Sequence, residues 1–306
     1  MRLYRKALTV GAIAAFIFLL TLSLTGSQFF TKLENIFYDW TVKSIRGDKP
    51  IADKIAIVLI DDASLDALDS RLGRWPWPRA VYSDLLEFLS KGGPEAVLFD
   101  VLFTETESPS SSGIGPNDRQ LVIATKNSGD VYHAMELLKD VKDDLQKSTL
   151  NENLPEDFRK KFAISNIKTE EGYQSVNNNY RIPFKQLYEV SHGIGVVQFK
   201  PDDDGVFRRT RPIREYHGSF FPVMGLAPLA KNNPVVISGG SVKIGGRQIP
   251  LDKNRDYILN MYGKFNPYSI SGLLNSQRKI DEGELADLEV NPAEFKGKIV
   301  YVGGSA

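Results

Sequence analysis

The chain has 306 residues, of which 42% are hydrophobic, and its formal net charge is zero. This length and apolar content are ample for a substantial core. The balanced charge gives no reason to expect nucleic acid binding, which requires an excess of basic residues. There is no cysteine, which excludes disulfides, thiol catalysis and cysteine metal sites.

An uncharged apolar segment lies near the start of the chain. Residues 7–31 read ALTVGAIAAFIFLLTLSLTGSQFFT, and as a helix they would extend roughly 37 Å, enough to cross a hydrocarbon layer of about 30 Å. Arg2, Arg5 and Lys6 precede this predicted transmembrane helix, so we expect residues 1–6 in the cytoplasm and the rest outside. A cleaved signal peptide is the alternative, but the run is long for one and its cleavage site is poorly formed. Either interpretation exports the following domain.

Residues 32–47 are predicted to form a juxtamembrane helix. Leu33, Ile36, Phe37 and Trp40 fall on one helical face at the i, i+3, i+4 and i+7 spacing. This helix either passes a signal to the membrane or packs on the domain that follows. Both interpretations stay open.

Residues 54–103 predict a β-α-β unit. The apolar runs at 55–60 and 96–103 are typical of strands that are covered on both faces of a parallel sheet. Between them, Pro78 suits the first turn of a helix and residues 81–89 carry its apolar stripe. We expect the crossover to be right-handed.

The rest of the chain is predicted to alternate helices and strands, without an internal repeat or a second domain. Residues 104–117 are rich in Ser, Pro and Gly and are expected to form a loop. The strands at 193–199 and 206–215 are expected to pair around a tight turn at Asp204-Gly205. The predicted helices are 118–127, 136–161 and 220–231, and the predicted strands are 130–135, 193–199, 206–215, short strands between 235 and 259, and 299–302.

Asp61, Asp62 and Asp100 support the strongest enzymatic hypothesis. They lie at the ends of neighbouring predicted strands, and ligands of open α/β sheets bind outside the carboxyl ends of the strands. Their oxygens could hold Mg²⁺. We favour a structural interpretation, in which Asp62 caps the next helix and a buried acid pairs with Arg79 or Arg74. No metal site is therefore expected.

The segment WPWPR, residues 75–79, carries two tryptophans that the following prolines keep extended. Rigid aromatic rings beside an arginine could form a ligand pocket. More often such rings plug the end of a core, with Trp77 stapling the helix start. The candidate ligand-sensing residues are Trp75, Trp77, Arg79, Asp61 and Asp100.

No other motif for catalysis or metal binding is complete. Residues 202–205 read DDDG, whereas an EF-hand loop needs alternate ligands and a later glutamate. The three histidines lie far apart in the sequence, and neither a GxSxG elbow nor a P-loop occurs. We expect no cofactor and no catalytic activity in this chain.

Five motifs occur in order along residues 37–306. They are IAIVLIDDASLDAL, WPWPRAVYSDLLEFL, EAVLFDVLFTE, the D-G-x-x-R segment DDDGVFRRTRPI and the closing FKGKIVYVGGSA. Together they resemble the CHASE domain of the second type, CHASE2, an extracytoplasmic sensor module of bacterial signalling receptors. Any one motif alone would be weak, but their order makes the resemblance specific.

The resemblance implies an α/β fold with a mixed, mainly parallel central sheet flanked by helices and preceded by one transmembrane helix. It implies that residues 48–306 form a periplasmic sensor domain of a receptor in the bacterial cytoplasmic membrane, which works as a homodimer. Outputs in the family include adenylate cyclases and histidine kinases, and its stimuli, small molecules or proteins, are undefined. Family members continue through more sensor sequence, so we expect a truncated sensor whose closing strand lacks a neighbour.

Two other functions stay open. One is an exported Mg²⁺-dependent hydrolase that uses Asp61, Asp62 and Asp100, which would require metal binding that Asp100→Asn weakens. The other is a membrane-anchored envelope scaffold, in which the domain offers a protein-binding surface without signalling.

Overall fold

The structure is a computed structural model of the whole chain. The residues that it describes are 2–25, 28–42, 44, 53–107, 113–138, 153–169, 177–259 and 265–304. Predicted features at 45–47, 108–112 and 139–152 lie outside this description. The chain divides into two compact units, of which the first is Met1–Ile51 with Asp203–Val206 and Asn260–Lys264, and the second, here the α/β domain, is Ala52–Asp202, Phe207–Leu259 and Phe265–Ala306.

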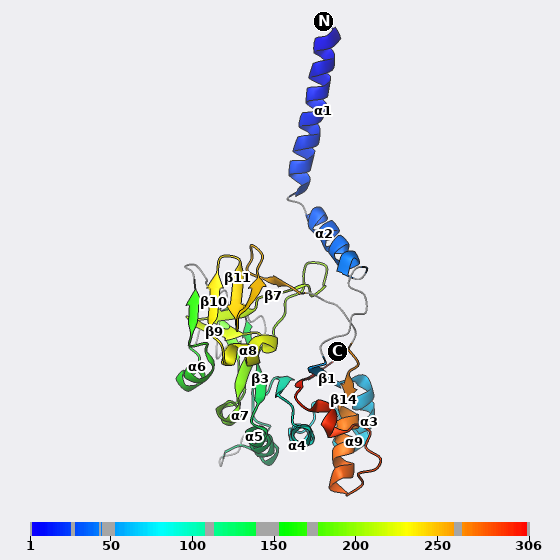
Figure 1. Ribbon diagram of the computed structural model, residues 1–306, viewed down its shortest axis with the longest axis vertical. Helices are drawn as coiled ribbons and strands as arrows, with labels where there is room; N and C mark the ends of the chain where they lie inside the picture. The colour runs from blue at the N-terminus through cyan, green and yellow to red at the C-terminus, as the bar shows by residue number, and fades with distance from the viewer. Residues whose placement is uncertain are drawn as a thin grey trace. The chain divides into compact units, whose positions relative to one another are not determined.

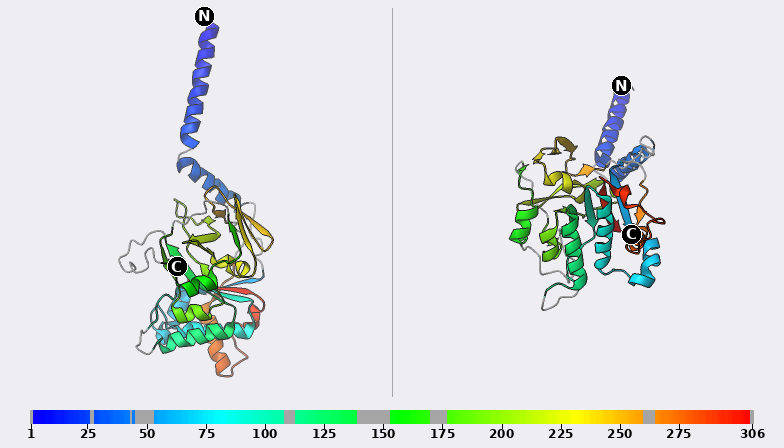
Figure 2. Two further views of the ribbon diagram at one scale, coloured as in Figure 1. Left: turned by 90° about the vertical axis from the view of Figure 1, so that its left-hand side faces the viewer. Right: turned by 60° about the horizontal axis from the view of Figure 1, so that its bottom comes forward.

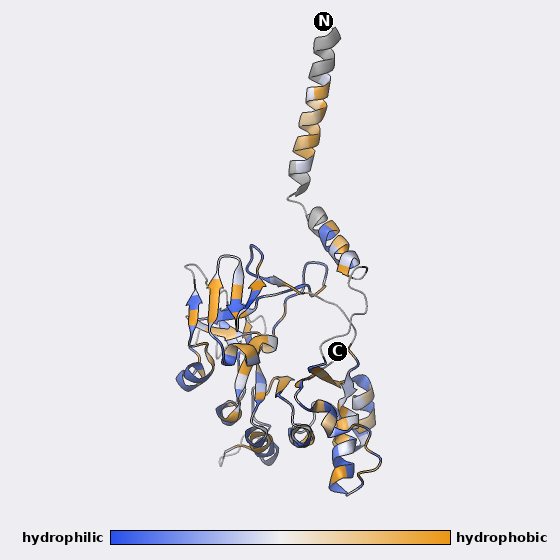
Figure 3. Cartoon of the chain, viewed as in Figure 1, coloured by the Kyte–Doolittle hydropathy of each residue, from blue (hydrophilic) through white to orange (hydrophobic). Residues whose placement is uncertain are grey.

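The first unit contains helices α1 (Arg2–Thr25) and α2 (Gln28–Thr41). The predicted membrane segment is thus shared between two helices, and glycine at position 26 of the sequence is a poor helix former. Hydrophobic residues dominate the described side chains of α1, all of which are exposed (Figure 3). No helix in the described part of the chain is both long and apolar enough to cross a membrane.

The α/β domain contains the remaining elements. Its helices are α3 (Asp62–Leu72), α4 (Ala80–Gly92), α5 (Pro116–Ser128), α6 (Glu156–Phe162), α7 (Lys185–Val190), η3 (Met224–Leu226), α8 (Ala227–Lys231), α9 (Ile270–Asp281) and η4 (Pro292–Phe295). Its strands are β1 (Ile55–Ile60), β2 (Ala96–Asp100), β3 (Val131–Leu138), β4 (Ile167–Thr169), β5 (Asn179–Arg181), β6 (Gly193–Val196), β7 (Arg209–Thr210), β8 (Ile213–Tyr216), β9 (Ser219–Pro222), β10 (Val235–Ser238), β11 (Ser241–Ile244), β12 (Arg247–Pro250), β13 (Tyr257–Ile258), β14 (Tyr268–Ser269) and β15 (Ile299–Gly304).

The central sheet has seven strands in the order β14-β1-β15-β2-β3-β5, with β6 also paired to β3. All of these pairs are parallel except β3 with β5. Helices α4, α5 and α7 form a row along the sheet (Figures 1 and 2). The prediction of a mainly parallel α/β sheet with flanking helices is confirmed.

Strand β15 lies inside the sheet rather than at its edge. Val300 is opposite Ala56 of β1 on one side and opposite Val97 of β2 on the other. The expectation that the closing strand lacks a neighbour is therefore wrong. Its apolar run, in which Val300 and Val302 are buried, suits a strand that is paired on both sides.

Alternate residues of the strands supply two separate layers of the core. Val97 and Phe99 of β2 pack with α4, α5 and α9 in the largest hydrophobic cluster. Ala96 and Leu98 face the other way and pack with Met224 of η3 and with α8. This period of two follows from strand geometry, and it buries β2 on both faces.

The second half of the chain forms a smaller β region. A four-stranded sheet has the order β12-β11-β10-β4, and two further pairs are β13-β7 and β8-β9. The short strands predicted between residues 235 and 259 are confirmed as β10 to β13. Strands β10 and β11 share a separate core with Ile213 and Ala230.

Three sequence predictions in this half were wrong. Strands β6 and β7 do not pair around Asp204-Gly205, because β6 pairs with β3 and β7 with β13. The hairpin lies instead between β8 and β9, where His217 and Gly218 take positive φ angles of 45° and 78°. The predicted helix at 220–231 begins only at η3, because the residues before it extend β8–β9 pairing and Pro228 suits a first turn.

The third error concerns the predicted helix 136–161. Its first residues belong to strand β3, which ends at Leu138, and helix α6 covers only Glu156–Phe162. Charged residues favoured a helix here, but Glu136 pairs with Arg181 across β3 and β5 at 3.1 Å. The buried side chains of β3, with this ion pair near its end, favour a strand over a helix.

Close packing at the end of α4 gives a stability test. A Cβ on Gly92 would lie 2.0 Å from the carbonyl oxygen of Pro292, whereas a Cβ on Gly272 in α9 would meet nothing closer than 3.5 Å. Ala in a helix normally stabilises by about 0.5–1 kcal/mol over Gly. We predict that Gly272→Ala gains this amount, while Gly92→Ala loses about 1–3 kcal/mol from overpacking. Urea unfolding of both variants measures the difference, and equal effects would contradict the packing.

Candidate functional site

A cavity of about 760 Å³ opens where β1, β15 and β2 end. Ligands of open parallel sheets bind at this end of the strands, and the volume is typical of small-molecule sites. The wall is mostly apolar. Its chemically distinctive members are Trp75, Trp77, Arg79, Asp100, Glu107 and Gly304.

The two tryptophans of WPWPR form one wall of the cavity. Trp77 is 3% exposed and belongs to the main core, whereas Trp75 is 45% exposed. Their rings are 5.5 Å apart in an edge-to-face arrangement, and the Trp75-Pro76 peptide bond is cis. The indole Nε1 of Trp77 is buried without a hydrogen-bond partner. Trp77 therefore belongs to the core and also lines the cavity.

Arg79 is held by a partner that the sequence did not suggest. Its guanidinium forms an ion pair with Asp118 of α5, whose side chain is fully buried. The guanidinium also lies over the rings of Phe103 and Phe184, at 5.8 and 5.1 Å from their centroids. The sequence does carry a signal for Asp118. Leu121 and Thr125 follow it at i+3 and i+7, so all three lie on the same buried face of α5.

Glu107 connects the WPWPR segment to the same cluster. Its carboxylate accepts hydrogen bonds from the backbone N–H of Arg79 at 2.5 Å and from the side-chain amide of Asn117 at 2.8 Å. Its own backbone N–H donates to Asp118 at 3.1 Å. The entry to α4, the loop after β2 and the start of α5 are thus tied together.

Asp100 ends β2 on the cavity wall. Asp100 is exposed to solvent on one side, and the incomplete solvation of its carboxyl raises the pKa, as does the negative charge of Glu136. Gly303 of β15 lies beside it, where an added Cβ would come 3.2 Å from the Asp100 Cβ. Gly304 has open space at the corresponding position and faces the cavity.

Asp61 ends up outside this group. It caps helix α3 by accepting a hydrogen bond from the Ser64 N–H at 2.8 Å, and it also accepts from Ser269 Oγ at 3.1 Å. Burial would raise the pKa of Asp61, but the hydrogen bonds from Ser64 and Ser269 outweigh it and lower the pKa. Asp61 therefore caps helix α3 and does not line the cavity.

The proposed metal ligands do not come together. Asp62 is exposed in the first turn of α3, so the helix cap is Asp61 and not Asp62 as predicted. Strand β15 separates β1 from β2, so Asp61 and Asp100 do not lie on neighbouring strands. Among the residues that the structure describes, no three His, Cys, Asp or Glu side chains form a group that could hold a metal ion.

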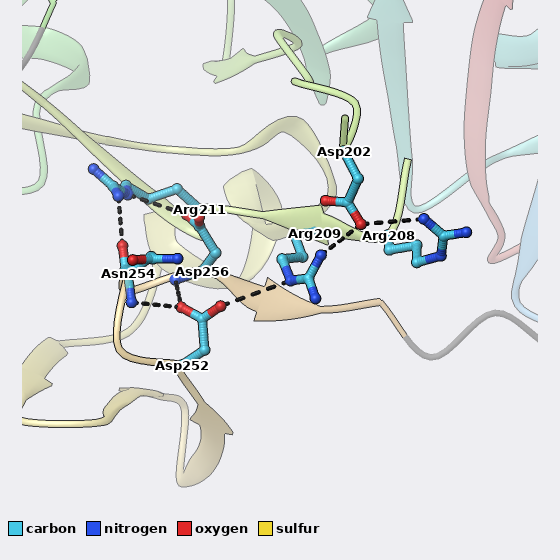
Figure 4. A network of polar contacts seen from close by, with 7 residues as sticks. All are labelled: Asp202, Arg208, Arg209, Arg211, Asp252, Asn254 and Asp256. Carbon is cyan, nitrogen blue, oxygen red and sulfur yellow. Dashed lines mark hydrogen bonds and ion pairs between the residues drawn. The ribbon is translucent and has the colours of Figure 1, made fainter. Parts of the chain in front are cut away.

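The D-G-x-x-R segment forms an ionic network away from the cavity (Figure 4). Arg208 is 4% exposed and pairs with Asp202 at 3.2 Å, and Arg209 pairs with the same carboxylate. Arg209 and Arg211 also reach Asp252 and Asp256, in the turn before β13, at 3.7 and 3.3 Å. The network joins β7 to that turn and is structural, which explains the run of arginines.

The cap at Asp61 predicts a pH-dependent stability difference. Because the folded-state pKa lies below the ordinary value of 3.8, the stabilisation is present above that value and is lost as the pH falls through the folded pKa. Asp61→Ala should therefore cost about 0.5–2 kcal/mol at pH 7 and much less at pH 2. Urea unfolding at both pH values measures this. Asp62→Ala is the control and should cost less, since Asp62 makes no cap; a pH-independent loss at position 61 would contradict the assignment.

The buried ion pair between Arg79 and Asp118 predicts the outcome of a double-mutant cycle. Arg79→Met leaves Asp118 buried without its charge partner, so it should destabilise the fold by about 3–5 kcal/mol. Arg79→Met with Asp118→Leu should recover most of that loss, because neither charge then remains. Chemical denaturation of the two single variants and the double variant measures their free energies of unfolding. If the loss in the double variant equals the sum of the two single losses, the pair is not coupled.

Comparison with known proteins places the whole α/β domain in one family. The CHASE2 domain family matches residues 12–306, nearly the whole chain. A search of the curated proteins found no match, nor did a search of the solved structures. The match covers all of the strands that build the cavity. The chain therefore belongs to the CHASE2 family, whose domain is a sensor module of signalling receptors.

Proposed function

We propose that this domain senses a small molecule that binds in the cavity at the ends of β1, β15 and β2. The observation that carries the proposal is the cavity itself, with Trp75, Trp77 and Asp100 on its wall. In a sensor domain, a partly apolar cavity with a few polar groups is the default ligand site. A scaffold would require an exposed protein-binding face rather than such a cavity.

The signal would pass to an output module by a shift between two arrangements of the receptor. A ligand can shift such an equilibrium only if it binds the two arrangements with different affinity. Helix α2 is the proposed connection, and its Ile36, Phe37 and Trp40 side chains are 61–65% exposed. Exposed apolar side chains on one helix suit contact with a second copy of the receptor, and we propose a homodimer.

The receptor is proposed to reside in the bacterial cytoplasmic membrane, with the α/β domain in the periplasm. Support comes from the N-terminal Arg2, Arg5 and Lys6, which favour the cytoplasmic side. It also comes from α1, whose described side chains at residues 9–21 are apolar or small and are all exposed. The regulated module is proposed to be a nucleotide cyclase or a kinase, as the family's domain architecture implies.

A variant that fills the cavity tests the proposal. Gly304→Leu adds a side chain where nothing lies within 4 Å, so it should fold normally and occupy the ligand's space. We predict that at least one compound in a panel of amino acids, amines, organic acids, sugars and nucleosides raises the melting temperature of the full chain. Binding at a hundredfold excess over Kd stabilises by about 2.7 kcal/mol. Gly304→Leu should abolish this rise.

Lys243→Leu is the matched control, because it adds the same side chain at an exposed position of β11. It should keep the ligand-induced rise. A compound that stabilises Gly304→Leu as well as the unchanged chain binds elsewhere and would contradict the site. No stabilisation of well-folded protein by any compound would favour a protein stimulus or a scaffold.

A further inference from the structure

Once the ion pair between Arg79 and Asp118 is set aside, the charged groups that remain on the cavity wall are negative. Among the described residues of its wall, Arg79 is the only basic one, and Asp118 already neutralises it. Two carboxylates, those of Asp100 and Glu107, face the same space. Glu107 receives hydrogen bonds from neutral donors, which leaves its negative charge in place.

Asp100 is the carboxylate that lacks any compensation. In the described part of the chain it has no ion-pair partner and accepts no side-chain hydrogen bond. The charge that acts on it is the like charge of Glu136, which opposes its ionisation. A bound cation would stabilise the ionised form of such a carboxylate, because an opposite charge nearby favours ionisation.

The aromatic wall favours the same kind of ligand. A cation is attracted to the face of an indole ring when it lies within about 6 Å, and tryptophan is the strongest of the aromatic residues in this respect. Trp75 and Trp77 supply two rings at an angle of 70°. The Trp77 Nε1–H is buried without an acceptor, so a ligand that carries an acceptor atom would satisfy it.

We propose that the cavity binds an organic cation, an amine or quaternary ammonium compound with an apolar body, whose charge lies between Asp100 and the two tryptophan rings. This inference rests on the proposed sensor function of the same cavity. It also assigns different roles to the predicted sensing residues. Asp100, Trp75 and Trp77 contact the ligand, and Arg79 positions the wall through Asp118. Asp61 caps helix α3, accepts a hydrogen bond from Ser269 and does not contact the ligand.

Three probes of similar shape but different charge test the proposal. They are phenylethylamine, 2-phenylethanol and 3-phenylpropionate, each titrated into the ¹⁵N-labelled full chain. The indole N–H signals of the three tryptophans report on binding at the site, and Trp75→Phe and Trp77→Phe assign them. We predict that phenylethylamine shifts both cavity indoles and binds at least tenfold more tightly than the alcohol or the anion.

Asp100→Asn then separates charge from shape. The side chain keeps its size, and removal of an uncompensated carboxylate leaves the fold intact, which the dispersed spectrum verifies. Phenylethylamine should bind this variant at least tenfold more weakly, while phenylethanol should change less than twofold. An unchanged amine affinity in Asp100→Asn, or tighter binding of phenylpropionate than of the amine, would overturn the cation assignment.

The same titrations distinguish failure of the ligand class from failure of the site. If phenylethanol or phenylpropionate shifts the two indoles and Gly304→Leu prevents it, the cavity is a ligand site but not for cations. If none of the three probes shifts either indole at saturating concentration, both the cation assignment and the proposed small-molecule site are contradicted.

Discussion

The ion pair between Arg79 and Asp118 fixes the cavity wall. Asp118 is fully buried, so its charge is tolerable only because the guanidinium of Arg79 meets it. The same carboxylate accepts the backbone N–H of Glu107, and Glu107 accepts the backbone N–H of Arg79. One buried charge thus fixes the positions of the WPWPR segment, the loop after β2 and helix α5 relative to one another. Trp75 and Trp77 owe their positions to this arrangement.

The position of β15 determines which side chains can share a site. This strand is inserted between β1 and β2, so the acids at the ends of those strands are separated by its width. It ends at Gly304, which lines the cavity and has open space where a side chain would stand. A metal-dependent hydrolase would need Asp61 and Asp100 together, whereas the structure gives each a different environment.

Much of the α/β domain could be predicted from the sequence because its central strands are continuous apolar runs and because Pro78 lies just before helix α4. The true partners of β6 and β7 could not, because strand pairing over long separations leaves no local pattern. The hairpin at residues 217–218 could not either, because the short apolar run that follows it suits a helix as well as a strand. At the site, the sequence identified Trp75, Trp77, Arg79 and Asp100 as lining one cavity. It missed Asp118, whose importance depends on burial against Arg79, and it misplaced Asp61, whose serine partner Ser269 is distant along the chain.

We propose that the ends of β1, β15 and β2 form a ligand site whose charge preference is set by Asp100. A crystal structure of the full chain soaked with phenylethylamine tests this most directly. We predict electron density for the amine within hydrogen-bond distance of the Asp100 carboxylate and against the rings of Trp75 and Trp77. An ordered, empty cavity in those crystals, or the amine bound with its ammonium group turned away from Asp100, would contradict it.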